Sequence, residues 1–544
     1  MDRHGHQSTN RALSPDVIII GAGFAGISAL YHLRKLGLTC RIVERGEDIG
    51  GVWYWNRYPG ARVDSGIPSY VLNIPECWES WTWTELFPDH NEMSKFVNHC
   101  DRQIGIRKDT IFAKSVTGAR FDSCSARWEV ELDGGDEARM SCKYLICAVG
   151  TTSHRYKRMD KMLDNFHGRV YFPSLWPQRA NVDLGRQDVA VIGTGSSGLQ
   201  IVQELGPRVK SLTVYQRSYH AALPLPMSPF GGFDHRTPKD SLPALFESRK
   251  TTPSGLAMVA PQSKGTFEVS DSERHQMFEE LYAKGLPYWV GGFKDLTTNP
   301  EANRAAYDFW ARQTRSRIQD PRKRDIIAPL EPTYPFGAKR IGLECGYFDL
   351  FNRNNVDVID TSANSIAAIT GDGIVLKDGT SHRHDVIIPA MGYDLGNEII
   401  KSLGLRDTEN TPVDQLWSTD GIRTFVGIMH HGYPNMFMIC GPQSPGEQGN
   451  VPTCIDIQAT WIAETVHKME EEQIVSIRPK SQSAEEWNTK VHEVYNQDYY
   501  ASTRSRYTES GNPLFYGGGI DRYYAELKNA GKTWDHFEIV KHTP

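Results

Sequence analysis

Two strongly apolar runs along the chain are each followed at once by a glycine-rich turn. Residues 16–20 and 188–192 are apolar after a leading aspartate, and the turns occupy residues 21–26 and 193–198. An amphipathic segment after each turn predicts a helix. The order strand, G-x-G-x-x-G and helix is typical of dinucleotide binding, because small residues admit a pyrophosphate and the helix N-terminus offers free N–H groups. We therefore predict two dinucleotide sites rather than two tight turns that only pack a helix on a strand.

The residue about 20 positions past each turn distinguishes the two dinucleotides. Glu44 ends the apolar run after the first turn, where a carboxylate accepts hydrogen bonds from a ribose and repels a 2′-phosphate. Arg217 holds the corresponding place after the second turn, where a guanidinium favours a 2′-phosphate. The first fold is therefore expected to bind FAD and the second NADPH. The alternative for Arg217 is a solvated surface side chain.

Further apolar runs indicate a discontinuous α/β arrangement. The strand pattern resumes at 144–150, 356–360, 373–377, 385–393 and 432–442, the last of which is expected to return to the first fold. Residues 224–335 instead show proline and glycine and then helical charge patterning. The predicted fold is α/β, with two Rossmann-like dinucleotide-binding domains (FAD and NADP) and a helical insertion. The expected boundaries are 1–155 and 389–544 for the FAD-binding domain with the C-terminal segment, 156–220 and 336–388 for the linker and NADP-binding domain, and 221–335 for the insertion.

Bulk composition restricts the class of protein. A net charge of −6 at pH 7 and a pI near 6.3 give no overall attraction to nucleic acid or anionic lipid. No run of about 18 apolar residues indicates a membrane span, and the polar first ten residues are unlike a secretory signal. Nine scattered cysteines without a C-x-x-C pair suit a reducing compartment and give no metal-binding pattern. We therefore expect a cytoplasmic enzyme without metal, nucleic-acid or membrane partners.

Two long motifs resemble those of one flavoprotein family. Residues 50–64 read GGVWYWNRYPGARVD and match the pattern G-G-x-W-x-x-x-x-Y-P-G-x-x-x-D of Baeyer–Villiger monooxygenases. Residues 166–177 read FHGRVYFPSLWP and resemble the linker fingerprint F-x-G-x-x-x-H-x-x-x-W-P of the same family. Shorter segments at 215–218, 335–340 and 441–445 also resemble family segments. On these residues the chain is similar to the type I (class B) flavin-dependent enzymes from about residue 17 to its final helix.

The resemblance implies an FAD- and NADPH-dependent monooxygenase. Such an enzyme reduces FAD with NADPH, forms a C4a-peroxyflavin with O₂, and inserts one oxygen atom beside the carbonyl of a small-molecule ketone to give an ester or lactone. The family's lysine–arginine pair falls on Lys339 and Arg340, and we expect Arg340 to be the catalytic cation, oriented by the carboxylate of Asp64. The implied cofactor-binding residues are Gly21, Gly23, Phe24, Ala25, Gly26, Glu44, Gly51, Val52, Trp53, Trp55, Arg62, Asp64, Tyr70, Thr194, Gly195, Ser196, Ser197, Gly198, Gln200, Arg217, Ser218, Lys339 and Arg340. On spacing alone, a surface salt bridge for Asp64 and an ordinary helix-start cation for Arg340 remain alternatives.

Two positions depart from the family pattern. Phe172 stands where the fingerprint has histidine, and a phenyl ring cannot make that residue's hydrogen bonds. Near the C-terminus, residues 506–511 read RYTESG where relatives carry W-Y-x-G-A-N, so Arg506 is expected to remodel the substrate pocket. The first departure predicts a shorter-lived peroxyflavin and release of hydrogen peroxide, with less peroxide from a Phe172→His variant. The alternative is an apolar niche adapted to Phe172, which a histidine would destabilise.

Two other functional classes stay open at this point. A related flavin monooxygenase that oxidises nitrogen or sulfur shares both nucleotide turns, although the surroundings of Asp64 and Arg340 favour the ketone enzyme. A non-oxygenating protein, either an uncoupled NADPH oxidase or a redox-sensing binder, is kept open by Phe172. The sequence leaves the ketone, the regiochemistry and the oligomeric state undetermined, because pocket walls come from segments whose arrangement is tertiary.

Overall fold

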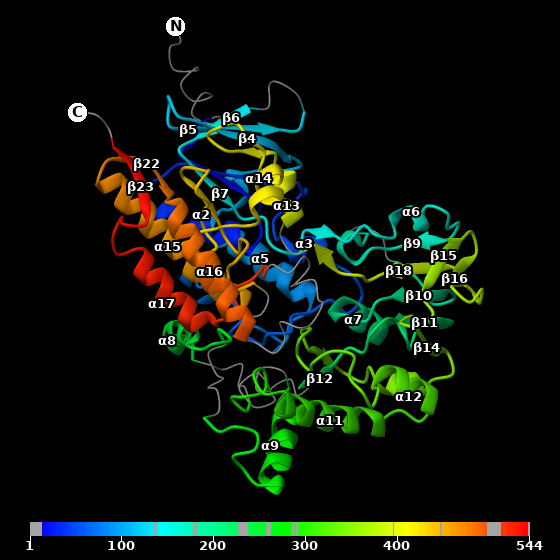
Figure 1. Cartoon of the computed structure of the whole chain (residues 1–544). Coiled ribbons are helices and arrows are strands. Elements are labelled where there is room, and N and C mark those ends of the chain that lie inside the picture. The colour runs from blue at the N-terminus through cyan, green and yellow to red at the C-terminus, as the bar shows by residue number, and fades with distance from the viewer. Residues whose placement is uncertain are drawn as a thin grey trace.

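Two parallel sheets form the framework of the molecule. The computed structural model describes residues 14–134, 139–177, 182–226, 238–256, 263–285, 289, 292–394, 397–446, 449–497 and 513–541. Figure 1 shows the two sheets in separate parts of the molecule, each accompanied by helices. Parallel sheets are buried on both faces, which explains why their strands read as continuous apolar runs rather than as alternating patterns.

The first sheet contains β1 (Val17–Ile20), β2 (Cys40–Val43), β3 (Thr110–Ile111), β7 (Tyr144–Cys147) and β21 (Met436–Met438). Its order is β21-β7-β1-β2-β3, and every neighbouring pair is parallel. The glycine turn follows β1, the central strand, whose residues are all buried. Because β21 pairs with β7, the prediction that residues 432–442 return to the first fold is confirmed.

The second sheet contains β9 (Arg169–Val170), β10 (Asp188–Ile192), β11 (Ser211–Gln216), β14 (Val356–Asp360) and β18 (Val386–Pro389). Its order is β14-β11-β10-β18-β9, again parallel throughout. The strands predicted at 188–192 and 356–360 are confirmed, and the one predicted at 385–393 already ends at Pro389. The run at 373–377 is also a strand, but it lies outside this sheet, and the edge strand β9 comes from the motif at 166–177.

Smaller sheets surround this framework. One contains β4 (Val116–Asp122), β5 (Arg127–Leu132), β6 (Arg139–Cys142) and β20 (Leu405–Arg406), and another contains β15 (Ile366–Thr370), β16 (Gly373–Leu376) and β17 (Ser381–Arg383). The paired strands are β8 (His154–Arg155) with β19 (Tyr393–Asp394), β12 (Ala222–Pro224) with β13 (Gly342–Glu344), and β22 (Ile474–Pro479) with β23 (Phe537–Lys541).

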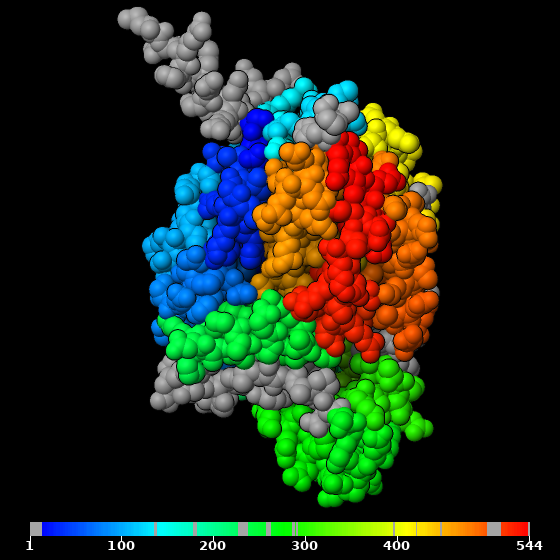
Figure 2. Space-filling view, turned by 90° about the vertical axis from the view of Figure 1, so that its left-hand side faces the viewer, coloured from blue at the N-terminus to red at the C-terminus, as the bar shows by residue number. Residues whose placement is uncertain are grey.

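Helices from distant parts of the chain cover the first sheet. α2 (Phe24–Lys35) begins at the first glycine turn and packs against α15 (Val451–Glu471), which also contacts α17 (Ile520–Ala530). Figure 2 shows N-terminal residues in blue, residues of α15 in orange and C-terminal residues in red side by side on one face. The second glycine turn opens α7 (Ser196–Leu205). Other helices are α3 (Val52–Trp55), α4 (Pro75–Trp78), α5 (His90–Ile104), α6 (Asp160–Leu163), α13 (Asn397–Ser402), α14 (Val413–Asp420) and α16 (Ser481–Gln497).

The described part of the predicted insertion is helical. It contains α8 (Leu242–Ser248), α9 (Asp271–Lys284), α11 (Pro300–Ser316) and α12 (Pro321–Ile327), drawn in green in Figure 1. An aromatic cluster joins its helices to β12 and to Tyr219, which follows β11: Trp310 is fully buried and donates its indole N–H to the Ala222 carbonyl at 2.8 Å. Tyr219 and Tyr334 stack beside it with ring centroids 4.2 Å apart. The insertion is therefore anchored beside the second nucleotide fold, while its exact bounds stay a prediction.

Three features of the described residues bear on the predicted chemistry. No helix there is both long and apolar enough to cross a membrane. Over the same ranges, no three histidine, cysteine, aspartate or glutamate side chains are grouped to hold a metal ion. The nine cysteines are free thiols.

Candidate active site

One large cavity, of about 2190 Å³, lies between the two glycine turns. Ile20 and Ile192, at the carboxyl ends of β1 and β10, form part of its wall. Ligands of open parallel sheets bind at that end of the strands. All of the cofactor-binding residues predicted from the sequence line this cavity except Gly26 and Gly198. Side chains that lie as far apart in the sequence as Glu44 and Arg340 therefore share one site.

Close backbone contacts shape the first glycine turn. Gly21 has a φ of +106°, and a Cβ there would lie 2.6 Å from the Ala148 carbonyl oxygen. A Cβ on Gly26 would lie 1.9 Å from the Gly21 carbonyl oxygen. Gly51 approaches the same turn, since its Cβ would lie 2.7 Å from the Cα of Gly23. Only glycine allows α2, β1 and the 50–64 segment to meet this closely.

The second turn repeats this geometry. A Cβ on Gly193, whose φ is +104°, would lie 2.5 Å from the Ala390 carbonyl oxygen, and one on Gly198 would lie 2.2 Å from the Gly193 carbonyl oxygen. Gly195 differs, because a Cβ there would meet nothing within 4 Å. Gly193 and Gly198 thus explain the tight packing of α7 on β10. Gly195 leaves space on the cavity side of the turn.

Each turn presents the start of a helix to the cavity. Gly23 and Gly195 are the N-cap residues of α2 and α7, and neither helix has a side-chain cap. The N–H groups of the first helical turn are consequently available to an anion, and the helix dipole favours negative charge there. Open space at Gly195 adds room for such a group. Both turns therefore fit the pyrophosphate of a dinucleotide.

The Glu44 carboxylate is fixed at the end of β2. One of its oxygens accepts a hydrogen bond from the Ala22 N–H at 2.8 Å, and the other accepts one from the Gly46 N–H at 2.7 Å. The residue is only 5% exposed, and it lines the cavity. A carboxylate has about four acceptor positions, so these two bonds leave acceptors for ribose hydroxyls. The placement matches the predicted ribose contact.

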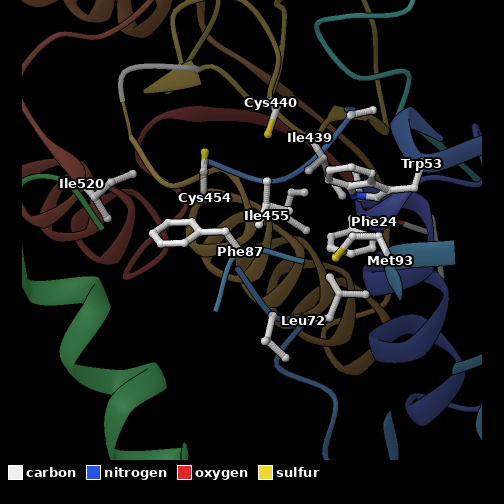
Figure 3. Close-up of a cluster of buried hydrophobic side chains, with 14 of the residues drawn as sticks. Phe24, Trp53, Leu72, Phe87, Met93, Ile439, Cys440, Cys454, Ile455 and Ile520 are labelled. Carbon is white, nitrogen blue, oxygen red and sulfur yellow. The ribbon is translucent and has the colours of Figure 1, made fainter. Parts of the chain in front are cut away.

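Three aromatic side chains form one wall of the cavity. The Tyr70 ring lies 5.8 Å from both the Trp53 and the Phe24 rings, measured between centroids. Figure 3 shows Trp53 and Phe24 next to each other in a buried apolar cluster. The buried Trp53 indole N–H has no hydrogen-bond partner among the described residues, which leaves a donor for a polar ligand. Burial raises the pKa of the Tyr70 phenol well above its ordinary value, so this wall is uncharged at neutral pH.

Three other predicted residues of the 50–64 segment have different surroundings. Val52 is exposed at the start of α3, and the Trp55 ring lies 4.9 Å from the guanidinium carbon of Arg45. The Arg62 guanidinium binds the Glu85 carboxylate at 3.1 Å and the Phe87 carbonyl at 3.0 Å. Arg62 therefore lines the cavity with its charge already paired to protein groups.

The predicted 2′-phosphate residues meet at the carboxyl end of β11. Arg217 directly follows this strand and lines the cavity. The Lys339 ammonium donates to the Ser218 hydroxyl at 2.7 Å and lies 4.1 Å from the centre of the Tyr334 ring. The Thr194 hydroxyl donates to the Ser218 carbonyl at 3.5 Å. Two cations and a hydroxyl from separate segments are thus placed together, as a phosphate site requires.

The 50–64 segment joins the two nucleotide folds. The Tyr58 hydroxyl donates to the Gln200 side-chain carbonyl at 2.8 Å, and the Gln200 amide donates to the Arg62 carbonyl at 3.2 Å. A Cβ on Gly60 would lie 2.7 Å from the backbone carbonyl of Gln200. The long motif is therefore an interface with α7, which explains its tyrosine and glycine.

Asp64 and Arg340 form an ion pair inside the cavity. The Arg340 Nε donates to one carboxylate oxygen at 2.8 Å and a terminal nitrogen donates to the other at 2.6 Å. Two parallel bonds of this kind fix the plane of the guanidinium as well as its distance. The side chains of Arg340 and Asp64 are 30% and 21% exposed, so the pair is neither fully solvated nor sealed off. The predicted pairing of the two residues is present.

Sequence reasoning missed several residues that line the cavity. His220 is one: its buried Nε2 has no partner among the described residues, and burial together with Lys339 lowers its pKa to about 4. Residues 217–220 read RSYH, and this short sequence matches no motif that would have identified His220 as a site residue. Others come from the linker and from the C-terminal third, namely Tyr156, Arg158, Met159, Cys440, Gly446, Val451, Ile455 and Tyr495.

The two departures from the family pattern have different outcomes. The Phe172 ring is half-buried against a small apolar core, and the guanidinium carbon of Arg155 lies 3.8 Å from its centre. The structure thus favours the interpretation in which the surroundings are adapted to a phenyl ring. Arg506 and its neighbours lie outside the described residues.

Known proteins share this architecture. Two dinucleotide folds that open into one cavity define an oxidoreductase that passes electrons between a nicotinamide and a flavin. Residues 19–80 match the model of the NAD(P)-binding Rossmann-like domain. The solved structure of OTEMO in complex with FAD and NADP resembles this one with a TM-score of 0.92, at 31% identity over 97% of this chain and 100% of that chain.

Named relatives extend over nearly the whole chain. FAD-binding monooxygenase acrE of Aspergillus aculeatus is 36% identical over 99% of this chain and 92% of its own length. Cyclopentanone 1,2-monooxygenase of Comamonas sp. is 35% identical over 92% of this chain and 90% of its own length. A Baeyer–Villiger monooxygenase of Pseudooceanicola batsensis is 30% identical over 93% of both chains. The chain therefore belongs to the Baeyer–Villiger monooxygenases, which use FAD, NADPH and O₂ to convert ketones to esters or lactones. The predicted family, fold class, cofactors and reaction are confirmed.

Two alanine substitutions in the second glycine turn should have opposite consequences. Gly198→Ala forces a methyl group against the Gly193 carbonyl, and we expect a loss of about 1–3 kcal/mol of unfolding free energy. Gly195→Ala meets no protein atom, so the thermal midpoint should stay unchanged while the KM for NADPH rises about tenfold, the equivalent of about 1.4 kcal/mol. Thermal unfolding and initial rates measure both effects. An unchanged KM in the folded Gly195→Ala variant would contradict the pyrophosphate assignment.

Proposed function

We propose that this monooxygenase oxidises its ketone with Arg340 as the catalytic cation and Asp64 as the residue that orients it. The observation that supports the proposal is the two-bond pair between these side chains, which projects into the cavity shared by both nucleotide folds. Bound FAD, once reduced by NADPH, supplies the activated oxygen. NADPH, O₂ and the ketone are the other reactants, and the remaining roles fall to side chains and backbone groups of this chain.

Arg340 suits a reaction in which negative charge develops on the ketone oxygen. A guanidinium keeps its proton at every relevant pH, so it donates hydrogen bonds without acting as an acid toward the oxygen being transferred. Because Asp64 holds two of its nitrogens, the remaining part of the group has a fixed direction. A prearranged donor of this kind costs no reorganisation during the reaction, and removal of one typically lowers kcat by about 10²–10³.

The nucleotide-binding groups separate into two sets. For FAD, we assign the start of α2 to the pyrophosphate and Glu44 to the adenosine ribose. For NADPH, we assign the start of α7 to the pyrophosphate, and Arg217 with Lys339 to the 2′-phosphate. The buried Trp53 N–H and the uncharged Tyr70 would face the flavin side of the cavity.

An apolar part of the cavity wall is proposed to receive the ketone. There Cys440, Val451 and Ile455 line the cavity with mostly apolar side chains, in the same cluster as Trp53 and Phe24 (Figure 3). Such a wall binds the hydrocarbon part of a ketone, while Arg340 receives its oxygen. One relative, cyclopentanone 1,2-monooxygenase, is named for a cyclic ketone of this chemical class. The proposal for this chain is limited to a ketone with an apolar body.

The first test concerns the coenzyme. Arg217→Ala removes a charge-assisted contact with the 2′-phosphate, so the preference for NADPH over NADH should fall about 10–100-fold, from contacts of about 1.5–3 kcal/mol. The ratio of kcat/KM for the two coenzymes measures this. Arg208→Ala, an exposed arginine in the same fold, serves as the control and should leave the ratio unchanged. If Arg217→Ala also leaves it unchanged, the 2′-phosphate assignment is wrong.

The second test concerns the chemistry. Arg340→Ala should retain FAD and yet lower ester formation from a ketone at least about 100-fold, because no fixed cation meets the developing charge. Arg340→Lys keeps the charge but loses the two-bond pair, and Asp64→Asn keeps the shape but loses the partner's charge; both should fall between Arg340→Ala and the parent. Product yield on a ketone panel and bound-flavin absorbance are the measurements. An ester yield from Arg340→Ala equal to that of the parent would contradict the proposal.

A further inference from the structure

Two stretches of the linker lie against each other beside the second nucleotide fold. The first includes β8, whose Arg155 pairs with Tyr393 of β19, and it ends at the start of α6. The second includes β9, which pairs with β18, and it continues through Phe172. Backbone pairing and apolar packing attach these stretches to the second fold. A side-chain contact attaches the stretches to each other.

That contact is made by Arg155, Asp160 and Phe172, here called the linker clamp. The Arg155 guanidinium binds both carboxylate oxygens of Asp160, at 2.5 and 2.7 Å, and its carbon lies 3.8 Å from the centre of the Phe172 ring. Both charged side chains are largely shielded from water, at 21% and 30% exposure. A cation held over an aromatic face at this distance is attracted to it, and shielding strengthens the attraction. The clamp thus couples charge pairing and ring stacking in one unit.

The clamp closes a short loop that enters the cofactor cavity. Between its two charged members run residues 156–159, of which Tyr156, Arg158 and Met159 line the cavity. The Tyr156 N–H donates to the Gly392 carbonyl at 3.0 Å, which fixes the start of this loop on the end of the second fold. Since Arg155 and Asp160 hold the two ends of the loop together, their pairing sets how far it projects into the cavity.

The same strand pair reaches the flavin side. Tyr393, the partner of Arg155 in the β8–β19 pair, donates its hydroxyl to the side chain of Asn56, which follows α3 in the 50–64 segment. A small cavity between Arg155, Phe172 and Ser197 places the clamp directly beside the first turn of α7. The clamp is therefore in contact with elements that carry both predicted nucleotide sites.

We propose that the linker clamp is a positioning device for NADP(H). It sets the loop 156–159 against the bound coenzyme and so determines how firmly the coenzyme is held after it has reduced the flavin. Phe172 is a positioning residue in this arrangement through its ring face, and Arg155 provides the polar group that position 172 lacks. The consequence for oxygen transfer rests on the proposed function, whereas the consequence for coenzyme binding does not.

Four variants separate the parts of the clamp. Phe172→Leu keeps apolar volume but removes the ring face, Arg155→Met keeps length but removes the charge, and Phe172→Tyr restores the face as the conservative variant. Arg169→Met makes the same chemical change at an exposed linker arginine and is the control. The FAD-loaded protein is titrated with NADP⁺, followed by flavin absorbance, to give a Kd. Hydrogen peroxide formed per NADPH consumed is measured in parallel, and thermal unfolding monitors the fold.

Phe172→Leu should weaken NADP⁺ binding about three- to tenfold and raise the peroxide fraction, as expected for loss of one shielded cation–aromatic contact. Arg155→Met also loses the pair with Asp160, so its effect on both should be at least as large. The double variant should bind NADP⁺ no more weakly than Arg155→Met alone, because Arg155→Met already removes both contacts of the guanidinium. Phe172→Tyr and Arg169→Met should match the parent. Phe172→His should raise the peroxide fraction, since it exchanges the phenyl face under Arg155 for a weaker one.

A clamp that only stabilises the fold would give a different pattern. Phe172→Leu and Arg155→Met would then lower the thermal midpoint but leave the NADP⁺ Kd and the peroxide fraction within twofold of the parent, and the proposal would be overturned. Additive losses in the double variant would also overturn it. Failure of the oxygenation chemistry would appear instead as absent ester in the parent with an unaffected Kd series, so the two proposals fail separately.

Discussion

The absence of a Cβ at the glycines of the two nucleotide turns is the constraint on which the architecture depends. At Gly21 and Gly193 the neighbouring chain passes so close that a Cβ would lie 2.6 and 2.5 Å from a carbonyl oxygen. Such separations are far below contact distance, so any side chain there would push apart the helix, the strand and the next crossover. With the glycines in place, both helix N-termini point into one cavity. The backbone N–H groups and the dipole at each helix N-terminus then attract the negatively charged pyrophosphate of a dinucleotide.

Once the helices are fixed, the 50–64 segment decides how the two folds face each other. Tyr58 and Gly60 seat it on α7, and Asp64 at its end reaches Arg340 from the other fold. The pair therefore serves two purposes, since it links the folds and orients the cation proposed to act on the ketone. A partly exposed ion pair contributes only modestly to stability, so its geometry matters more for the chemistry than for holding the protein together.

The linker shows how a changed residue can be matched by its surroundings. A phenyl ring at position 172 makes no hydrogen bonds, but its face accepts the guanidinium of Arg155, which Asp160 in turn neutralises. The polar partner of position 172 is thus a side chain of β8. The neighbouring apolar core, which includes Leu163 and Phe166, packs against the ring.

The sequence by itself determined the features that depend on local spacing. Apolar runs gave the strands of both sheets, the glycines gave the turns, and the positions of Glu44 and Arg217 relative to those turns gave the two coenzymes, because backbone geometry converts such intervals directly into position. Family motifs added Asp64 and Arg340. Tertiary structure decided which groups the site side chains contact. Arg62 is paired with Glu85, the Trp53 N–H has no partner within the described part of the chain, and Arg155 lies over Phe172. These contacts join segments whose proximity depends on how whole elements pack, and no local periodicity encodes that packing.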